Sequence, residues 1–212
     1  FDNQSSINNN LCILCSVTSF NPGIKGNAAY FSNPNYLKYP VLGNIDKNEG
    51  SVSFWIKPNN SNVAGGFFDY GEIGTPSSIG LFKPSWDALY FEFRPNETIG
   101  GAQLAGTINS SNWIYATAVW KTNLLFINNN VSFFKLYLNG NHVSTRLYDG
   151  SVPNNIFNFN PEENYFSVGR CGFYGIANSY IDEFKIYDYA RNSTEIKQDY
   201  KDYIGACLID SD

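Results

Sequence analysis

Short runs of alternating apolar and polar residues recur along the chain, and this pattern constrains its fold more than any other feature. Clusters of Asn, Gly, Pro and Ser, which favour turns, bound the runs. Many short strands at this spacing are typical of an antiparallel sandwich of two sheets. The clearest strands are predicted at residues 27–31, 51–57, 66–70, 78–82, 88–93, 113–121, 132–138, 165–168 and 180–187.

Two local signals mark the remaining organisation. Asn139-Gly140 predicts a tight hairpin, because both residues tolerate the positive φ that a type I′ turn requires. A short helix is predicted to begin at Asn192 or Ser193 and to run through Ile196 and beyond. With no internal repeat and no linker, the sequence predicts a single domain over residues 1–212.

The composition describes a globular chain with a large aromatic core. The 212 residues include 17 Phe, 15 Tyr and 4 Trp, and only 16% are charged. The net charge is −5 and no basic run occurs, so the electrostatic footprint of nucleic-acid binding is missing. No apolar run approaches the roughly 20 residues of a membrane span, so direct membrane insertion is not expected.

The four cysteines, Cys12, Cys15, Cys171 and Cys207, suggest two disulfides. A zinc site is not expected, since His142 is the only histidine. Residues three apart on a strand point to opposite faces, so Cys12 and Cys15 are expected to bond to distant partners. We therefore expect each of them to pair with one of Cys171 and Cys207.

Sequons for N-glycosylation also favour an extracellular or cell-surface location. They occur at Asn3, Asn96, Asn109, Asn130 and Asn192. The alternative is chance, because a chain rich in Asn and Ser produces such triplets without selection.

The order of several motifs resembles the laminin-G-like jelly rolls of the concanavalin A-like lectin/glucanase superfamily. The resemblance implies an all-β, two-sheet antiparallel jelly-roll sandwich with a short C-terminal helix. One departure is that Ile114 follows Trp113, where the family often has His. The motifs are Phe1-Asp2, Gly26-Asn27-Ala28, Phe31 ahead of Tyr36-Leu37, the run 51–58, Trp113 through Trp120, the run 135–140, Val168-Gly169-Arg170 and the run 180–190.

Catalysis is not expected. Laminarinase-like members of the superfamily carry two Glu around an Asp on one strand, and no such spacing exists in this chain. The nearest acid pairs, Asp69 with Glu72 and Glu92 with Glu97, are split by a Gly turn or by Pro95. Glu92 and Glu183 are expected on different strands, so they could form a catalytic pair only if the fold brought those strands together. A nucleophilic triad would rest on His142 alone.

The resemblance also implies a structural calcium ion between the opening segment and the closing strand. Asp182 is the first candidate ligand and Asp2 the second, since hard cations prefer carboxylate and carbonyl oxygens. The alternative is that Asp182 accepts backbone hydrogen bonds and Asp2 is simply a terminal acid.

A ligand is expected on loop tips or on a sheet face, where aromatic rings stack on sugars. Trp86 is the first candidate, with Phe173 and Tyr174 second. The alternative is that these rings pack on neighbouring loops.

The sequence thus predicts a non-catalytic, extracellular or cell-surface recognition or adhesion module that binds a glycan or a protein surface. The second hypothesis is a structural subunit of a filament, coat or surface layer that self-assembles. The third and weakest is a polysaccharide-active enzyme. The fold alone does not choose among them.

Overall fold

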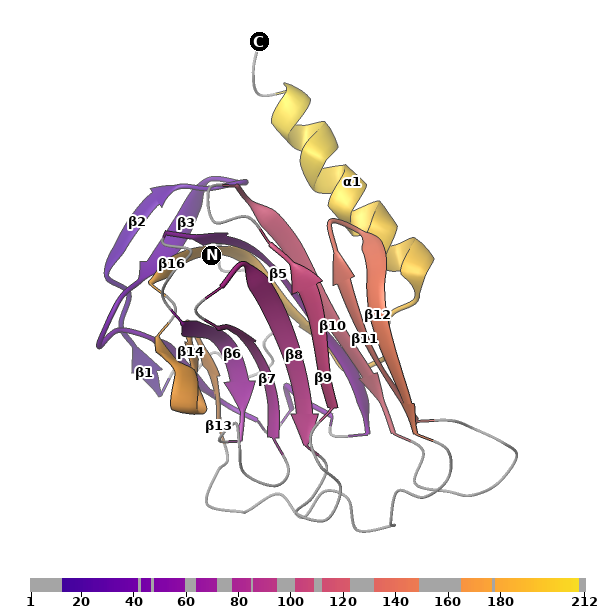
Figure 1. Ribbon diagram of the computed structural model, residues 1–212. Coiled ribbons are helices and arrows are strands. Elements are labelled where there is room, and N and C mark those ends of the chain that lie inside the picture. Colours follow the sequence, from indigo (N-terminus) through magenta and orange to yellow (C-terminus); the bar gives the residue numbers. More distant parts are fainter. Residues whose placement is uncertain are drawn as a thin grey trace.

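Two sheets packed face to face, with a helix beside them, make up the computed structural model (Figure 1). The structure describes residues 13–41, 43–46, 48–59, 64–71, 78–84, 86–94, 102–108, 112–122, 132–148, 165–176 and 178–209. The sheets are antiparallel throughout, apart from one parallel bridge between Ile176 and Gly66. The predicted class, a jelly-roll sandwich, is confirmed.

The first sheet contains nine of the described strands. A short 3-10 helix, η1 (Gly172–Tyr174), joins two of them beside β6. The order across the sheet is β1 (Leu14–Cys15), β4 (Leu37–Pro40), β13 (Tyr165–Val168), β6 (Gly65–Tyr70), β7 (Ser78–Lys83), β8 (Ala88–Arg94) and β9 (Ala102–Thr107), with β14 (Arg170–Cys171) and β15 (Gly175–Ile176) attached at β6.

The second sheet contains seven strands, and its middle strand is also its longest. The order is β12 (Asn141–Tyr148), β11 (Ser132–Leu138), β10 (Ile114–Lys121), β5 (Glu49–Pro58), β16 (Ser179–Tyr187), β3 (Asn27–Phe31) and β2 (Ser19–Pro22). Strands from both ends of the described chain therefore lie side by side at β3 and β16.

Period-two alternation explains how the sheets pack. On β5, Val52, Phe54 and Ile56 are fully buried and belong to the main core between the sheets. The intervening Trp55 lies on the opposite face, in a separate cluster with Tyr115 and Tyr203. A strand in the middle of this sheet is thus buried on both faces.

The hairpin prediction is confirmed, because Asn139 and Gly140 have φ values of 51° and 72° between β11 and β12. The helix is longer than expected: α1 runs over 17 residues, Ser193–Ile209. It begins with a reciprocal cap. The Asn192 side chain accepts the N–H groups of Thr194 and Glu195, and the Glu195 carboxylate accepts the Asn192 N–H at 2.7 Å.

Helix α1 packs on the outer face of the seven-stranded sheet, where a buried ion pair anchors it. The Arg191 guanidinium, whose side chain is 7% exposed, donates to the Asp199 carboxylate. Tyr115 of β10 and Tyr187 of β16 also donate to Asp199, at 3.3 and 3.1 Å. Rings of Tyr200 and Tyr203 pack on Trp55. The sheet buries one side of α1, and this packing stabilises a longer helix than the local sequence signals predicted.

The cysteine prediction is wrong for Cys171, which is a free, fully buried thiol. Cys15 does take part in a disulfide, and its partner lies outside the described side chains, as do Cys12 and Cys207. Cys171 packs against Gly66 of β6, and three strand spacings separate β6 from β1, which carries Cys15. That is about 14 Å, whereas bridged Cα atoms lie within about 7 Å.

Of the predicted sequons, Asn192 lies at an exposed position and its amide oxygen caps α1. Asn3, Asn96, Asn109 and Asn130 lie outside the described residues. Among the described residues, no helix has both the length and the apolar character that a membrane crossing would need.

The ion pair under α1 yields a prediction about stability and pH. Burial tends to raise the pKa of Asp199, but the hydrogen bond and charge of Arg191 outweigh it and lower the pKa. Its contribution is therefore present above about pH 4 and is lost as the pH falls through the folded-state pKa. We expect Asp199→Asn to reduce the free energy of unfolding by about 2 to 4 kcal/mol at pH 7, measured by urea denaturation.

In the same variant, the free energy of unfolding should fall less steeply below pH 4 than it does in the parent chain. Glu49→Gln is the matched control, because Glu49 forms an exposed ion pair with Lys121 and should cost under about 1 kcal/mol. Equal losses in the two variants would contradict a special role for the buried pair.

Candidate binding site

Two aromatic rings lie side by side on the outer face of the nine-stranded sheet. On β7 and β8, Leu81 and Phe91 point into the main core, so their neighbours Phe82 and Tyr90 point to the opposite face. Phe82 and Tyr90 are cross-strand partners. Their ring centroids are 5.6 Å apart with an angle of 11° between the planes, which is a stacked pair.

Two further rings extend this pair in both directions. Tyr174 of η1 stacks on Phe82, with centroids 3.9 Å apart and planes at 10°. Trp86, in the turn between β7 and β8, meets Tyr90 edge-on with centroids 6.2 Å apart. The four rings form a continuous line, Trp86–Tyr90–Phe82–Tyr174, which we call the aromatic row.

Exposure changes along the aromatic row. The Trp86 side chain is 57% exposed, Tyr90 and Tyr174 are partly exposed, and Phe82 is 1% exposed. The buried Phe82 ring contacts both Tyr90 and Tyr174, whereas the exposed Trp86 indole touches the row only through its edge-on contact with Tyr90, within the part of the chain that the structure describes. The aromatic row is thus a surface of packed rings in which Trp86, at one end, is the ring most accessible to a ligand.

The segment that carries Tyr174 is held against β6 by two local features. Asp69 of β6 accepts the Gly172 N–H at 2.6 Å. Gly66 allows close approach, since a Cβ at this position would lie 2.0 Å from the Cβ of Cys171. Without a glycine at position 66, the segment from Arg170 to Ile176 would have to move away from the sheet.

Charged side chains next to the aromatic row are mostly buried. Asp69 and Glu92 flank Gly80 on the same sheet face, and they are 3% and 2% exposed. Burial, followed by the charges of these two acids, raises the pKa of the Cys171 thiol well above its usual value. Lys83 is also buried and donates to the Pro84 carbonyl; burial lowers its pKa, and the charge of the exposed Asp87 opposes this shift.

The structure separates one suggested acid pair and brings together another that the sequence did not indicate. Glu92 lies on the outer face of the first sheet, whereas Glu183 accepts the Tyr203 hydroxyl beside α1, on the other side of the sandwich. Asp69 and Glu92 share a face, about 10 Å apart by two strand spacings. Both are buried, so neither opens onto a cleft. Glu72 and Glu97 lie outside the described residues.

Two of the three predicted ligand residues, Trp86 and Tyr174, therefore belong to one surface. Phe173 lies in η1, and its side chain is outside the described ones. Sequence reasoning missed Tyr90 and Phe82. Tyr90 was detectable from alternation, because it falls between Leu89 and Phe91 in the strand pattern, whereas the contact with Tyr174 depends on a segment far away in the sequence.

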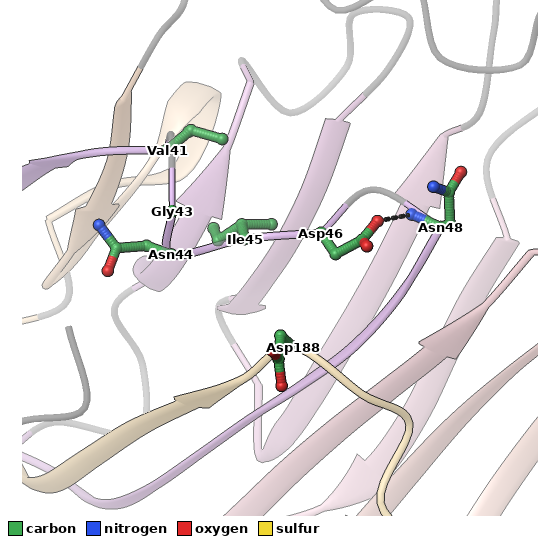
Figure 2. A pocket seen from close by; sticks show the side chains of 7 residues that line it. All are labelled: Val41, Gly43, Asn44, Ile45, Asp46, Asn48 and Asp188. Carbon is green, nitrogen blue, oxygen red and sulfur yellow. Dashed lines mark hydrogen bonds between the residues drawn. The ribbon is translucent and has the colours of Figure 1, made fainter. Parts of the chain in front are cut away.

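Apart from the aromatic row, a hollow of about 430 Å³ is lined by Val41, residues 43–46, Asn48 and Asp188. Figure 2 shows that its polar side chains do not converge. Asp46 accepts the backbone N–H of Asn48 at 2.7 Å, Asn44 donates to the Pro40 carbonyl at 2.8 Å, and Asp188 points away from Asp46 (Figure 2). This hollow therefore lacks the convergent groups of a ligand site.

Asp182, the first candidate calcium ligand, is fully buried and accepts three backbone hydrogen bonds. Its Oδ2 accepts the N–H groups of Ile24 and Lys25 at 2.8 and 3.1 Å, and its Oδ1 accepts that of Glu183 at 2.9 Å. Among the described residues there is no group of three His, Cys, Asp or Glu that could hold a metal ion. Asp2 lies outside them. Oxygens that already face N–H donors do not fit a cation, and the arrangement fits a clamp on the turn before β3.

The model of the Concanavalin A-like lectin/glucanases superfamily matches residues 31–197, which is most of the chain. The chain belongs to this superfamily. A search of curated proteins finds no match.

Solved structures of the same fold include toxin binding domains. The binding domain of Paraclostridial Mosquitocidal Protein 1 aligns with a TM-score of 0.64 at 14% identity, over 90% of this chain and 47% of that one. The binding domain of botulinum neurotoxin DC in complex with SialylT aligns with a TM-score of 0.63 at 15% identity, over 90% of this chain and 45% of that one. The same domain in complex with rat synaptotagmin II aligns with a TM-score of 0.62 at 16% identity, over 90% of this chain and 46% of that one. The chain spans less than half of these structures, and at such identities they show the fold alone.

The clamp formed by Asp182 yields a test against calcium. We expect Asp182→Asn to lower the free energy of unfolding by about 2 to 4 kcal/mol, because an amide cannot accept all three N–H groups. The loss should be the same in EDTA and in millimolar calcium, measured by thermal and urea unfolding.

Asp188→Asn is the matched control, since this acid follows the same strand but is exposed, and it should leave the midpoint unchanged. If calcium raised the melting midpoint of the parent chain and not that of Asp182→Asn, the metal site would be restored and the clamp interpretation rejected.

Proposed function

We propose that this domain is a non-catalytic recognition module that binds a glycan through the aromatic row, at the cell surface or outside the cell. The observation that carries the proposal is the continuous line of four rings, three of them stacked and the fourth, the exposed Trp86, edge-on at one end. A packed core does not require a large indole at 57% exposure, and exposed aromatic residues on a rigid scaffold are typical of recognition sites.

The chemistry of the row suits a sugar ring. A pyranose presents one face of C–H groups, which packs on the face of an aromatic ring, while its hydroxyl groups remain free for hydrogen bonds. Trp86 offers the open ring, and Tyr90 offers a partly exposed ring and hydroxyl beside it. The buried Phe82 ring stacks on Tyr90, so the Tyr90 side chain loses little conformational entropy on binding.

The structural neighbours support binding as the class of activity. Cell entry of botulinum neurotoxin type C depends on interaction with two ganglioside molecules, and the binding domain of botulinum neurotoxin DC forms complexes with SialylT and with rat synaptotagmin II. A protein surface is therefore the second partner class for this domain. The sequons and the disulfide at Cys15 are consistent with an extracellular setting.

One observation favours self-assembly as a second candidate function. Ile13, Leu14 and Phe20 are 56%, 41% and 59% exposed, on or next to the edge strands β1 and β2. Leu147, on the opposite edge strand β12, is 62% exposed. Edge strands with apolar side chains can pair with another copy. Sedimentation velocity over a range of concentrations would reveal such assembly.

The main test is a glycan array probed with the whole domain, followed by calorimetry on the best ligand. We expect Trp86→Ala to weaken binding by about thirtyfold, because truncating an anchoring tryptophan at a binding site typically costs 2 kcal/mol or more.

Phe20→Ala is the control, since Phe20 is an aromatic residue of equal exposure on the other sheet. It should bind like the parent chain. Glycan binding that survives in Trp86→Ala, or that is lost equally in Phe20→Ala, would rule out the aromatic row.

We also expect no hydrolysis of any polysaccharide. Cleavage of a glycosidic bond ordinarily requires two carboxyl groups that reach the bond from opposite sides, and Asp69 and Glu92 are buried. Reducing ends released from β-glucans, galactans and alginates would measure turnover. Activity that disappears in both Asp69→Asn and Glu92→Gln, while those variants remain folded, would show that the domain is an enzyme.

A further inference from the structure

A second line of aromatic residues crosses the outer face of the other, seven-stranded sheet. Tyr30 of β3 is the cross-strand partner of Tyr180 of β16, and Tyr180 is the partner of Lys57 of β5. Ile114 pairs with Ile56, so the preceding Trp113 comes next to Lys57. We call Tyr30, Tyr180, Lys57 and Trp113 the lysine row.

The lysine row faces away from the core. Its strand neighbours Ala29, Phe31, Ile181 and Ile56 all belong to the main core, and side chains alternate between the two faces. All four members are partly exposed. The row therefore lies on the opposite side of the sandwich from the aromatic row and is independent of it.

The rings of the lysine row touch and are held in place. The centroids of Tyr30 and Tyr180 are 4.7 Å apart, and those of Tyr180 and Trp113 are 6.4 Å apart. The Tyr30 hydroxyl donates to the Asn178 side chain and accepts from Asn59 at 3.4 Å. Asn178 has a φ of 37°, in the left-handed region that asparagine tolerates, and this fixes its amide at the end of the row.

Two donors in this row remain unused among the described residues. Neither the Lys57 ammonium nor the Trp113 indole N–H has a hydrogen-bond or ion-pair partner there. The acids nearest in sequence on β16 are occupied, Asp182 by three backbone N–H groups and Glu183 by the Tyr203 hydroxyl. Lys57 is thus a positive charge set between aromatic rings and not neutralised by these acids.

We propose that the lysine row binds an acidic saccharide, with the sugar rings on Tyr180 and Trp113 and a carboxylate or sulfate on Lys57. Charge complementarity selects this occupant. A lone ammonium and an indole N–H are donors without acceptor capacity, so they match a ligand rich in anionic oxygens. The aromatic row on the other sheet differs, since three acids, Asp69, Asp87 and Glu92, lie near it against one lysine, Lys83, and this balance favours a neutral sugar.

The test uses the whole domain and oligosaccharides that carry sialic acid, uronic acid or sulfate, each beside its desialylated, carboxyl-reduced or desulfated counterpart. We expect binding of at least one acidic member by calorimetry, at least about tenfold weaker binding of its neutral counterpart, and weaker binding in high salt. Lys57→Gln should weaken binding of the acidic member by about tenfold or more.

Control variants separate this site from the first. Lys201→Gln removes the same charge from an exposed position on α1, and Trp86→Ala disables the aromatic row; both should bind the acidic sugar like the parent chain. Tyr180→Phe retains the ring and should bind, whereas Trp113→Leu should not. Thermal midpoints verify that each variant is folded.

Three results would overturn the proposal. They are equal binding of acidic and neutral counterparts, binding by Lys57→Gln at the strength of the parent chain, and no binding of any acidic oligosaccharide at millimolar concentration. Loss of acidic binding in Trp86→Ala would assign the ligand to the aromatic row instead.

Discussion

Strand β5 is the element on which the rest of the structure depends, because it is buried on both faces. Its inward residues Val52, Phe54 and Ile56 form the middle of the core between the sheets, and its outward Trp55 supports α1. It also pairs with β10 along eight positions and with β16 along seven. Burial on two faces and pairing on two edges make this strand intolerant of a one-residue slip, which would exchange its two faces.

The clamps that complete the fold join segments distant in sequence. Asp199 of α1 accepts hydrogen bonds from Arg191 and from tyrosines on two strands, and burial raises the pKa of Tyr115 to about 12. Asp182 holds the turn before β3 through three backbone N–H groups. Asp182 is fully buried, Asp199 is partly buried, and hydrogen bonds satisfy both carboxylates, so each acts as a structural element and not as a free acid.

Both outer faces of the sandwich carry aromatic residues, and the two faces differ in charge. The aromatic row lies beside buried acids, whereas the lysine row contains an ammonium that has no ion-pair partner among the described residues. In each case the spacing of neighbouring strands, about 4.8 Å, by itself places cross-strand rings in contact with each other. A sheet face is therefore a ready scaffold for ring contacts, and the polar neighbours decide what the rings can bind.

Alternation and turn residues were enough to predict the sandwich, most of its strands and the Asn139-Gly140 turn, because these depend on local geometry and on which face of each strand is apolar. Trp86 and Tyr174 were chosen from the sequence, but their connection through Tyr90 and Phe82 was not visible there. Short strands without clear alternation, such as β1 and β9, and the full length of α1 were also missed, since pairing and packing by distant residues stabilise them.

The sequence by itself determined the class of fold and the chemical character of its surface, since hydrophobic period and composition are properties of neighbouring residues. Only the tertiary structure decided that Cys171 is free, that Asp182 clamps a turn, and that Glu92 and Glu183 lie on opposite sides. The physical reason is that the relative positions of residues far apart in the sequence depend on the order of strands in the sheets. Strand order follows from the packing of the whole chain, and no short stretch of sequence contains it.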